Sequence, residues 1–135
     1  MNATPKPSNE ELTRKRRQHA AALVGNALPA CLDLTLSEAL VLGLLRQEVH
    51  IFFTVLGHGS TEVGEVLRLY QEAGLVRVYG LRSEIEASHA ASALRWVTGE
   101  KAAAGFGTTG AETGSRQGNG TDYLWRNVIL PLVRS

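Results

Sequence analysis

Residues 50–84 decide the fold, and they read HIFFTVLGHGSTEVGEVLRLYQEAGLVRVYGLRSE. The stretch opens with a β-branched and aromatic run, residues 50–56, which is typical of a buried strand followed by a tight turn. A helical pattern then begins, with Ser60 as its expected N-cap, and ends at Gly74. Residues 75–79 form a second apolar run. The order strand, helix, strand with short connections predicts parallel strands joined by a crossover helix.

The same alternation continues downstream of this stretch. Ser83 can cap an alanine-rich helix that reaches about Thr98 and stops at Gly99. Residues 101–106 then form a third expected strand. We therefore expect an α/β fold with a mostly parallel sheet and helices on both faces.

Two capping-box signatures lie upstream of the expected sheet. Ser8 with Glu11, and Thr35 with Glu38, each place a hydroxyl side chain three residues before a glutamate. This spacing predicts the first turn of a helix, because the hydroxyl can accept from a free backbone N–H there. The first of these helices should run to about Asn26.

Composition limits the class of protein. The chain has 135 residues, which is room for one domain, and its formal charge of +1 argues against a dedicated nucleic-acid binder. We expect the domain at residues 8–114, between a disordered tail at 1–7 and a linker with a C-terminal helix at 115–135. A single cysteine, Cys31, rules out an internal disulfide, and the longest apolar stretch, 39–45, is too short to cross a bilayer. These features predict a soluble, cytoplasmic protein that binds neither membrane nor nucleic acid.

Three segments follow the three expected strands and are candidates for a binding site. In an open parallel sheet, ligands bind outside the carboxyl ends of the strands. The segments that reach this edge are Gly57-His58-Gly59-Ser60, residues 81–84 and Gly107-Thr108-Thr109-Gly110. Glycine, hydroxyl and charged groups gathered at one edge are what a binding site needs.

Glu84 is the candidate catalytic residue. With Ser83 as the N-cap, Glu84 would be the first helical residue and Glu86 the third, where Glu86 completes the capping box. Glu84 has no such assignment, although a surface carboxylate that balances the helix dipole also fits this position. Since the following helix is rich in alanine, it can pack closely and hold its first turn in a buried place. We then expect a desolvated glutamate that exchanges protons.

A family resemblance runs through the same residues. Residues 82–91, RSEIEASHAA, resemble the Arg-His-Glu-Gln…Ala-His-Ala-Ala stretch in the pyrimidine-binding domain of thiamine-diphosphate-dependent enzymes, of the acetolactate synthase and trihydroxycyclohexanedione hydrolase type. Residues 53–59 are similar to the Phe-Gly-His-Gly turn of the hydrolase type. Residues 98–110 are similar to the Thr-Gly-Lys-Pro…Thr-Ser-Gly-Pro-Gly stretch. The match covers roughly residues 35–114, and the order and spacing of the motifs carry it together.

The resemblance implies roles for particular residues. Glu84 would hydrogen-bond N1′ of the aminopyrimidine ring and favour its imino tautomer, whose imine removes the thiazolium C2 proton to give the ylid. The cofactor does the carbon chemistry, and the protein orients it. The implied cofactor-binding residues lie in the two glycine turns: Gly57, His58, Gly59, Thr108, Thr109 and Gly110.

The resemblance also implies a site that needs a second polypeptide. These enzymes hold the diphosphate through magnesium bound by Gly-Asp-Gly and a downstream Asn in a separate domain, and this sequence contains no Gly-Asp-Gly. We therefore expect no metal ligand from this chain. Thiamine diphosphate would be shared with a diphosphate-binding partner subunit or a homo-oligomer, so the chain would be inactive alone.

The expected reaction is decarboxylation, carboligation or C–C cleavage of a small 2-oxo acid or diketone, which makes the protein a component of a lyase, transferase or hydrolase. Four positions depart from the family pattern. Ser83 replaces a histidine or asparagine, Ile85 replaces a glutamine, and Ala111 and Glu112 replace the proline and second glycine of Gly-Pro-Gly.

Two other functions fit parts of the sequence. Residues 105–110 match GxGxxG after a strand, which is the pattern of a small nucleotide-binding or regulatory α/β module, although a dinucleotide fold carries it on the first strand. The domain also fits a degenerate, non-catalytic assembly partner. The basic run 14–17 is interpreted as a solvated helix face. Among the remaining residues, we expect a packed His89 and a core or interface anchor at Trp96, while His19 and His50 carry no functional signal.

Overall fold

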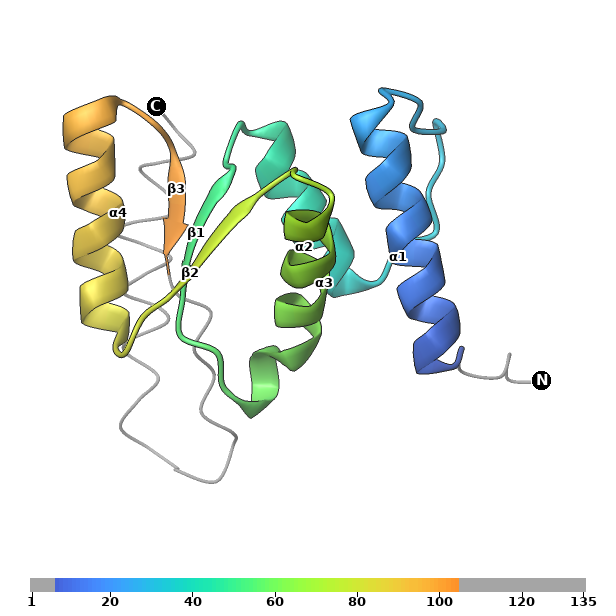
Figure 1. The fold of residues 1–135 in the computed structure, drawn as a ribbon, viewed down its shortest axis with the longest axis horizontal. Helices are drawn as coiled ribbons and strands as arrows, with labels where there is room; N and C mark the ends of the chain where they lie inside the picture. Colours follow the sequence, from blue (N-terminus) through green and yellow to red (C-terminus); the bar gives the residue numbers. More distant parts are fainter. Residues whose placement is uncertain (1–6, 105–135) are drawn as a thin grey trace.

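The computed structural model of the chain describes residues 7–104. The predictions for residues 1–6 and 105–135, which include most of the N-terminal tail and the whole C-terminal helix, lie outside this range. The described elements follow one another in this order (Figure 1): α1 (Asn9–Val24), α2 (Leu36–Arg46), β1 (Ile51–Thr54), the 3₁₀ turn η1 (His58–Ser60), α3 (Thr61–Glu72), β2 (Arg77–Gly80), α4 (Glu84–Thr98) and β3 (Ala102–Ala104).

The three strands form a parallel sheet in the order β2-β1-β3. In register, Ile51 of β1 lies opposite Arg77 on one side and Ala102 on the other. The chain therefore leaves β1, pairs β2 beside it, and then crosses to the opposite side of β1 to form β3. This confirms the α/β class and the parallel pairing that the strand and helix order predicted.

Helices cover both faces of the sheet, as expected (Figure 1). On one face α4 packs against β3 and β1, where Ala87 and Ala91 are buried beside Ile51, Ala102 and Ala104. On the other face α2 and α3 enclose a larger core around Phe52, and α1 packs outside them against α3. Small side chains on the inner side of α4 permit its close approach to the strands.

Most predicted helix ends are confirmed. The hydroxyls of Ser8, Thr35 and Ser83 each accept from the backbone N–H three residues further on, at 3.2 to 3.3 Å. These bonds satisfy donors that the first turn of a helix leaves free. Beyond α3 and α4, Gly74 and Gly99 adopt φ values of 75° and 76°, a conformation that glycine reaches without steric cost.

Two predicted caps differ in detail. Ser60 stands at the N-cap position of α3, as predicted, but its side chain makes no capping bond there, because its Oγ instead accepts from the Gly57 N–H at 2.9 Å and donates to the Gly57 carbonyl at 3.0 Å. The carboxylate of Glu86 accepts from the N–H of Arg82 at 3.3 Å, one residue before the N-cap Ser83. Both side chains therefore brace the turns that precede the helices.

The edge strand β2 has a side-chain hydrogen bond on its open side. Arg77 N–H donates to the carbonyl of His50, so the backbone of the next residue, Val78, points away from β1. The Val78 N–H donates to Oε1 of Gln71, at the end of α3, at 2.8 Å. One edge donor is thereby satisfied within the chain.

Two side chains predicted to be packed lie at the surface of α4. His89 is exposed, so its prediction as a packed histidine is wrong, and Trp96 is also exposed, so it is no core residue. The alanines take up the inner face of the helix, which leaves these larger residues outside. Among the helices of residues 7–104, none combines the length and apolar character needed to cross a membrane.

Candidate functional site

The strand order identifies where a ligand would enter the fold. The connection after β1 runs through α3 on one face of the sheet, whereas the connection after β2 runs through α4 on the other. In such sheets a crevice opens at the carboxyl ends of the two strands where the connections diverge. Here these strands are β1, which ends at Thr54, and β3, whose last described residue is Ala104.

The glycine turn after β1 is held by its own hydrogen bonds. Ser60 is buried, and its two bonds to Gly57 close the turn at the end of the strand. The chain before the turn lies against α3, since a Cβ on Gly64 would come within 3.0 Å of Leu56 Cδ1. Glycine at position 64 therefore lets this loop lie close to the helix. Hydrogen bonds and packing thus hold the turn that carries Gly57 and Gly59 in a defined position at the carboxyl end of β1.

Glu84 lies at the same edge. Leu81 N–H donates to the Thr54 carbonyl at 2.8 Å, which keeps the connection from β2 to α4 beside the end of β1. Glu84 follows as the first residue of α4, as predicted, and its backbone carbonyl accepts from Ser88 Oγ at 2.9 Å. Its side chain is half-buried, and no hydrogen bond or ion pair with the described residues engages its carboxylate. This carboxylate is therefore available to a ligand at the start of a helix.

The structure places part of the predicted cofactor site at one end of the sheet. Gly57, Gly59 and Glu84 follow neighbouring strands at one end of the sheet, and the backbone of His58 belongs to η1. The remaining predicted residues, Thr108, Thr109 and Gly110, lie outside the described residues. Close packing of the alanine-rich helix is confirmed by Ala87 and Ala91, which have no exposed surface.

The donor set at this edge suits a neutral heteroaromatic ring. One carboxylate and the backbone of a glycine turn can accept from and donate to a ring nitrogen and an amino group. Within residues 7–104, no cluster of three or more histidine, cysteine or acidic side chains is placed to hold a metal ion.

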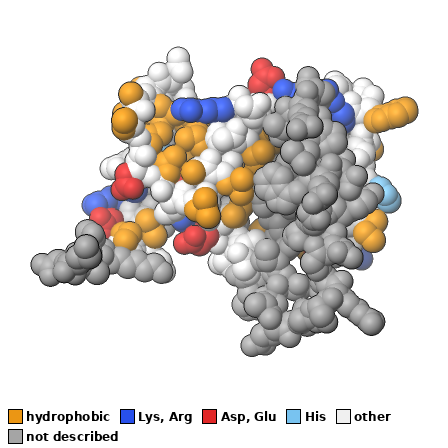
Figure 2. Space-filling view, turned by 180° about the vertical axis from the view of Figure 1, so that it is seen from behind, with side chains coloured by type: hydrophobic (Ala, Val, Ile, Leu, Met, Phe, Trp, Pro, Cys, Tyr) orange, Lys and Arg blue, Asp and Glu red, His pale blue; other side chains and the backbone are white. Residues whose placement is uncertain are grey.

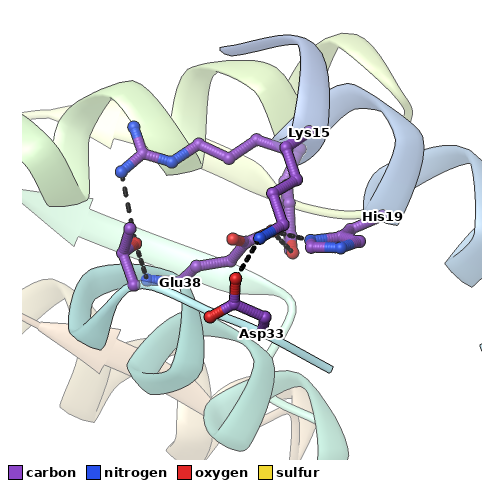
Figure 3. Close-up of polar contacts among 7 residues, drawn as sticks. Lys15, His19, Asp33 and Glu38 are labelled. Atoms are coloured by element: carbon purple, nitrogen blue, oxygen red, sulfur yellow. Dashed lines mark hydrogen bonds and ion pairs between the residues drawn. The ribbon is translucent and has the colours of Figure 1, made fainter. Parts of the chain in front are cut away.

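A second polar cluster, which the sequence analysis missed, is buried among α1, α2 and α3. Glu38 is only 2% exposed, and its Oε1 accepts from the hydroxyl of buried Tyr70 at 3.2 Å. His19 Nδ1 lies 2.8 Å from the same oxygen, and Figure 3 shows these two side chains pointing toward each other. Burial, together with the adjacent Glu38 carboxylate, raises the pKa of Tyr70 above its ordinary value of 10.0.

Arg16 completes this cluster from the α1 side. It is buried, and its Nη2 donates to Thr35 Oγ1 at 3.2 Å, while the same hydroxyl accepts from the backbone N–H of Glu38. The interpretation of residues 14–17 as a solvated face is therefore wrong for Arg16. Beside the cluster, Lys15 and Asp33 form an ion pair at 2.5 Å.

The contacts of the cluster indicate that it fastens α1 to the rest of the fold. The bonds of His19 and Arg16 both lead from α1 to the start of α2, and Tyr70 adds α3 to the same carboxylate. The buried side chain of Glu38 thereby has two polar partners, which is how proteins keep such groups inside. His19 and Arg16 share the side of α1 that carries buried Ala20. Their spacing of three and four residues is typical of one helix face, and it could have indicated from the sequence that both side chains point toward the rest of the fold.

No protein-family model, curated protein or solved structure was found to match this chain.

Proposed function

We propose that this chain is the pyrimidine-binding half of a thiamine-diphosphate enzyme and that Glu84 activates the aminopyrimidine. The observation that carries the proposal is the half-buried Glu84 carboxylate, which is without a partner among the described residues and lies at the sheet edge that also holds the Gly57–Gly59 turn. The sequence resemblance assigns the family glutamate to the same position. In this view the fold is a shortened pyrimidine-binding domain.

The residues of this chain would bind and orient the ring. Glu84 would share a proton with N1′, so that its carboxyl donates to the ring nitrogen and accepts from N1′–H once the imino tautomer has formed. The glycine turn would let the ring approach the backbone, because no side chains stand at positions 57 and 59. Ser60 would keep that turn in place through its two bonds to Gly57. When bound, thiamine diphosphate supplies the nucleophilic carbon for chemistry on a 2-oxo acid or diketone.

The proposal assigns the other half of the site to a partner. A diphosphate-binding subunit, or a second copy in a homo-oligomer, would hold the diphosphate with magnesium, and the complete enzyme would act in the cytoplasm. A half-buried Glu84 fits this arrangement, since a polypeptide that closes the edge would remove the remaining water from the carboxylate.

The first test measures binding to the complete chain. Amide NMR spectra are recorded during titration with thiamine diphosphate and with 4-amino-5-hydroxymethyl-2-methylpyrimidine, and both should shift the amides of residues 57–60 and 84–86. Glu84→Gln should weaken both effects at least about tenfold, because it removes a charge-assisted hydrogen bond. Glu86→Gln is the matched control, since Glu86 lies in the same turn but bonds to Arg82, and it should bind normally.

Other outcomes of this titration contradict the proposal. Shifts confined to other parts of the chain, or equal binding by wild type and Glu84→Gln, would remove Glu84 from the site. A stronger response to NAD or ATP would favour a nucleotide-binding module instead. In a complex with a diphosphate-binding partner, Glu84→Gln should abolish exchange of the cofactor C2 proton while leaving assembly intact, and persistence of exchange would refute the catalytic role.

A further inference from the structure

The outer face of α4 carries large apolar side chains with no cover among the described residues. Ile85, Trp96 and Val97 are 70%, 92% and 84% exposed. Ile85 and Trp96 are eleven residues apart, which returns to the same side of a helix after three turns. Figure 2, which views the molecule from behind Figure 1, shows hydrophobic side chains standing out along the α4 side, at the right. An exposed tryptophan on a helix is a frequent anchor of protein contacts.

The face is arranged so that it can match a second copy of itself. Its apolar residues lie at the two ends, Ile85 in the first turn and Trp96 near the last. Between them the exposed positions are Glu86, His89, Ser92 and Ala93, of which Ser92 and Ala93 are small and permit close approach. If two copies of α4 pack antiparallel, Ile85 of each meets Trp96 of the other. This is the pairing that a two-fold contact requires, because each patch must be complementary to itself.

The charges on α4 select the same orientation. The first turn is acidic, with Glu84 and Glu86, and the last turn contains Arg95. Antiparallel packing places the acidic turn of each helix beside the basic turn of the other, and the helix dipoles are then also opposed favourably. Parallel packing would place like charges together. We propose that the outer face of α4 is the contact surface of a homodimer in which the two α4 helices run antiparallel.

Sedimentation of the complete chain tests this proposal without any cofactor, so its result is separate from that of the proposed function. The wild type should form a dimer, and Trp96→Ala should raise the dimer dissociation constant at least about 30-fold, as the loss of an aromatic anchor does. Leu36→Ala is the matched control, because Leu36 is 88% exposed but lies at the start of α2 on the other side of the sheet. It should leave the constant unchanged.

Cross-linking tests the orientation of the helices. In a Cys31→Ser background, Ser92→Cys should link two copies through a short bifunctional thiol reagent, because residue 92 lies near the centre of the paired helices. Ile85→Cys should not, since eleven residues at 1.5 Å per residue separate the two copies of position 85 by about 16 Å along the axis. Efficient linking at both positions would indicate parallel packing and overturn the proposal. A monomer at about 100 μM, including one in which residues 105–135 cover α4, would overturn it too.

Discussion

Replacement of Glu38 by alanine probes the buried cluster that fastens α1. The carboxylate is almost completely enclosed, and the hydroxyl of Tyr70 and the ring of His19 both depend on its Oε1. In Glu38→Ala the Tyr70 hydroxyl stays buried without its acceptor, and the ring of His19 loses its partner on α2. The chain should still fold, but with α1 held less firmly.

The magnitude follows from these two losses. A buried group left without its hydrogen-bond partner costs about 1–3 kcal/mol, and Tyr70 and His19 each lose theirs. We therefore expect Glu38→Ala to lower the free energy of unfolding by about 2–6 kcal/mol, a large share of the roughly 5–15 kcal/mol typical of a domain. Glu38→Gln keeps an acceptor for Tyr70, so its loss should be smaller.

Urea unfolding of the complete chain, followed by circular dichroism, measures this loss. If the free energy of unfolding falls by about 2 kcal/mol per molar urea, the urea concentration at the midpoint of unfolding should fall by about 2 M. Glu62→Ala is the matched control, because Glu62 is an exposed glutamate that accepts from Ser37 Oγ at 3.2 Å, and it should cost at most about 0.5 kcal/mol. If Glu38→Ala costs no more than Glu62→Ala, the cluster does not stabilise the fold and the assignment of its role is wrong.

Two further predictions concern stability. The pKa of Tyr70 is raised in the folded state by burial and by Glu38. The neutral hydroxyl therefore contributes its full share to the free energy of unfolding below the unfolded-state pKa near 10.0, and this share is lost as the pH rises above that pKa. Unfolding free energies measured from pH 8 to 11 should therefore fall less steeply in Tyr70→Phe than in wild type, and parallel curves would contradict this. Alanine at Gly99, where φ is 76° and no atom lies within 4 Å of the new Cβ, should cost about 1 kcal/mol through backbone strain alone. Alanine at Gly43, in the exposed interior of α2, should instead stabilise by about 0.5–1 kcal/mol, so thermal unfolding should separate the two variants in sign.

Local signals in the sequence predicted much of this fold. The caps at Ser8, Thr35 and Ser83, and the stops at Gly74 and Gly99, depend on residues within one turn of each other, so spacing alone reveals them. The parallel order followed from the strand and helix alternation. Ser60 was assigned to the wrong partner because its hydroxyl can reach either the helix after it or the turn before it, and only the geometry of that turn decides.

The buried cluster could not be predicted in the same way. His19, Glu38 and Tyr70 come from three helices, 19 and 32 residues apart, and their contact exists only after those helices have packed. The candidate site could be predicted from the sequence only in part. The position of Glu84 at the start of α4 followed from the N-cap Ser83 beside it in the sequence. The burial of its carboxylate depends instead on which parts of the fold pack against the carboxyl end of the sheet.

The hydrogen bond from Val78 to Gln71 has a consequence for how the protein associates with others. Exposed strand edges invite pairing with other chains, and proteins avoid this by occupying or shielding the free backbone groups. With the outward donor of Val78 taken by a side chain, β2 is a poorer template for an incoming strand. Self-association through an extended sheet is thereby discouraged, and ordered contacts are left to the helical surfaces.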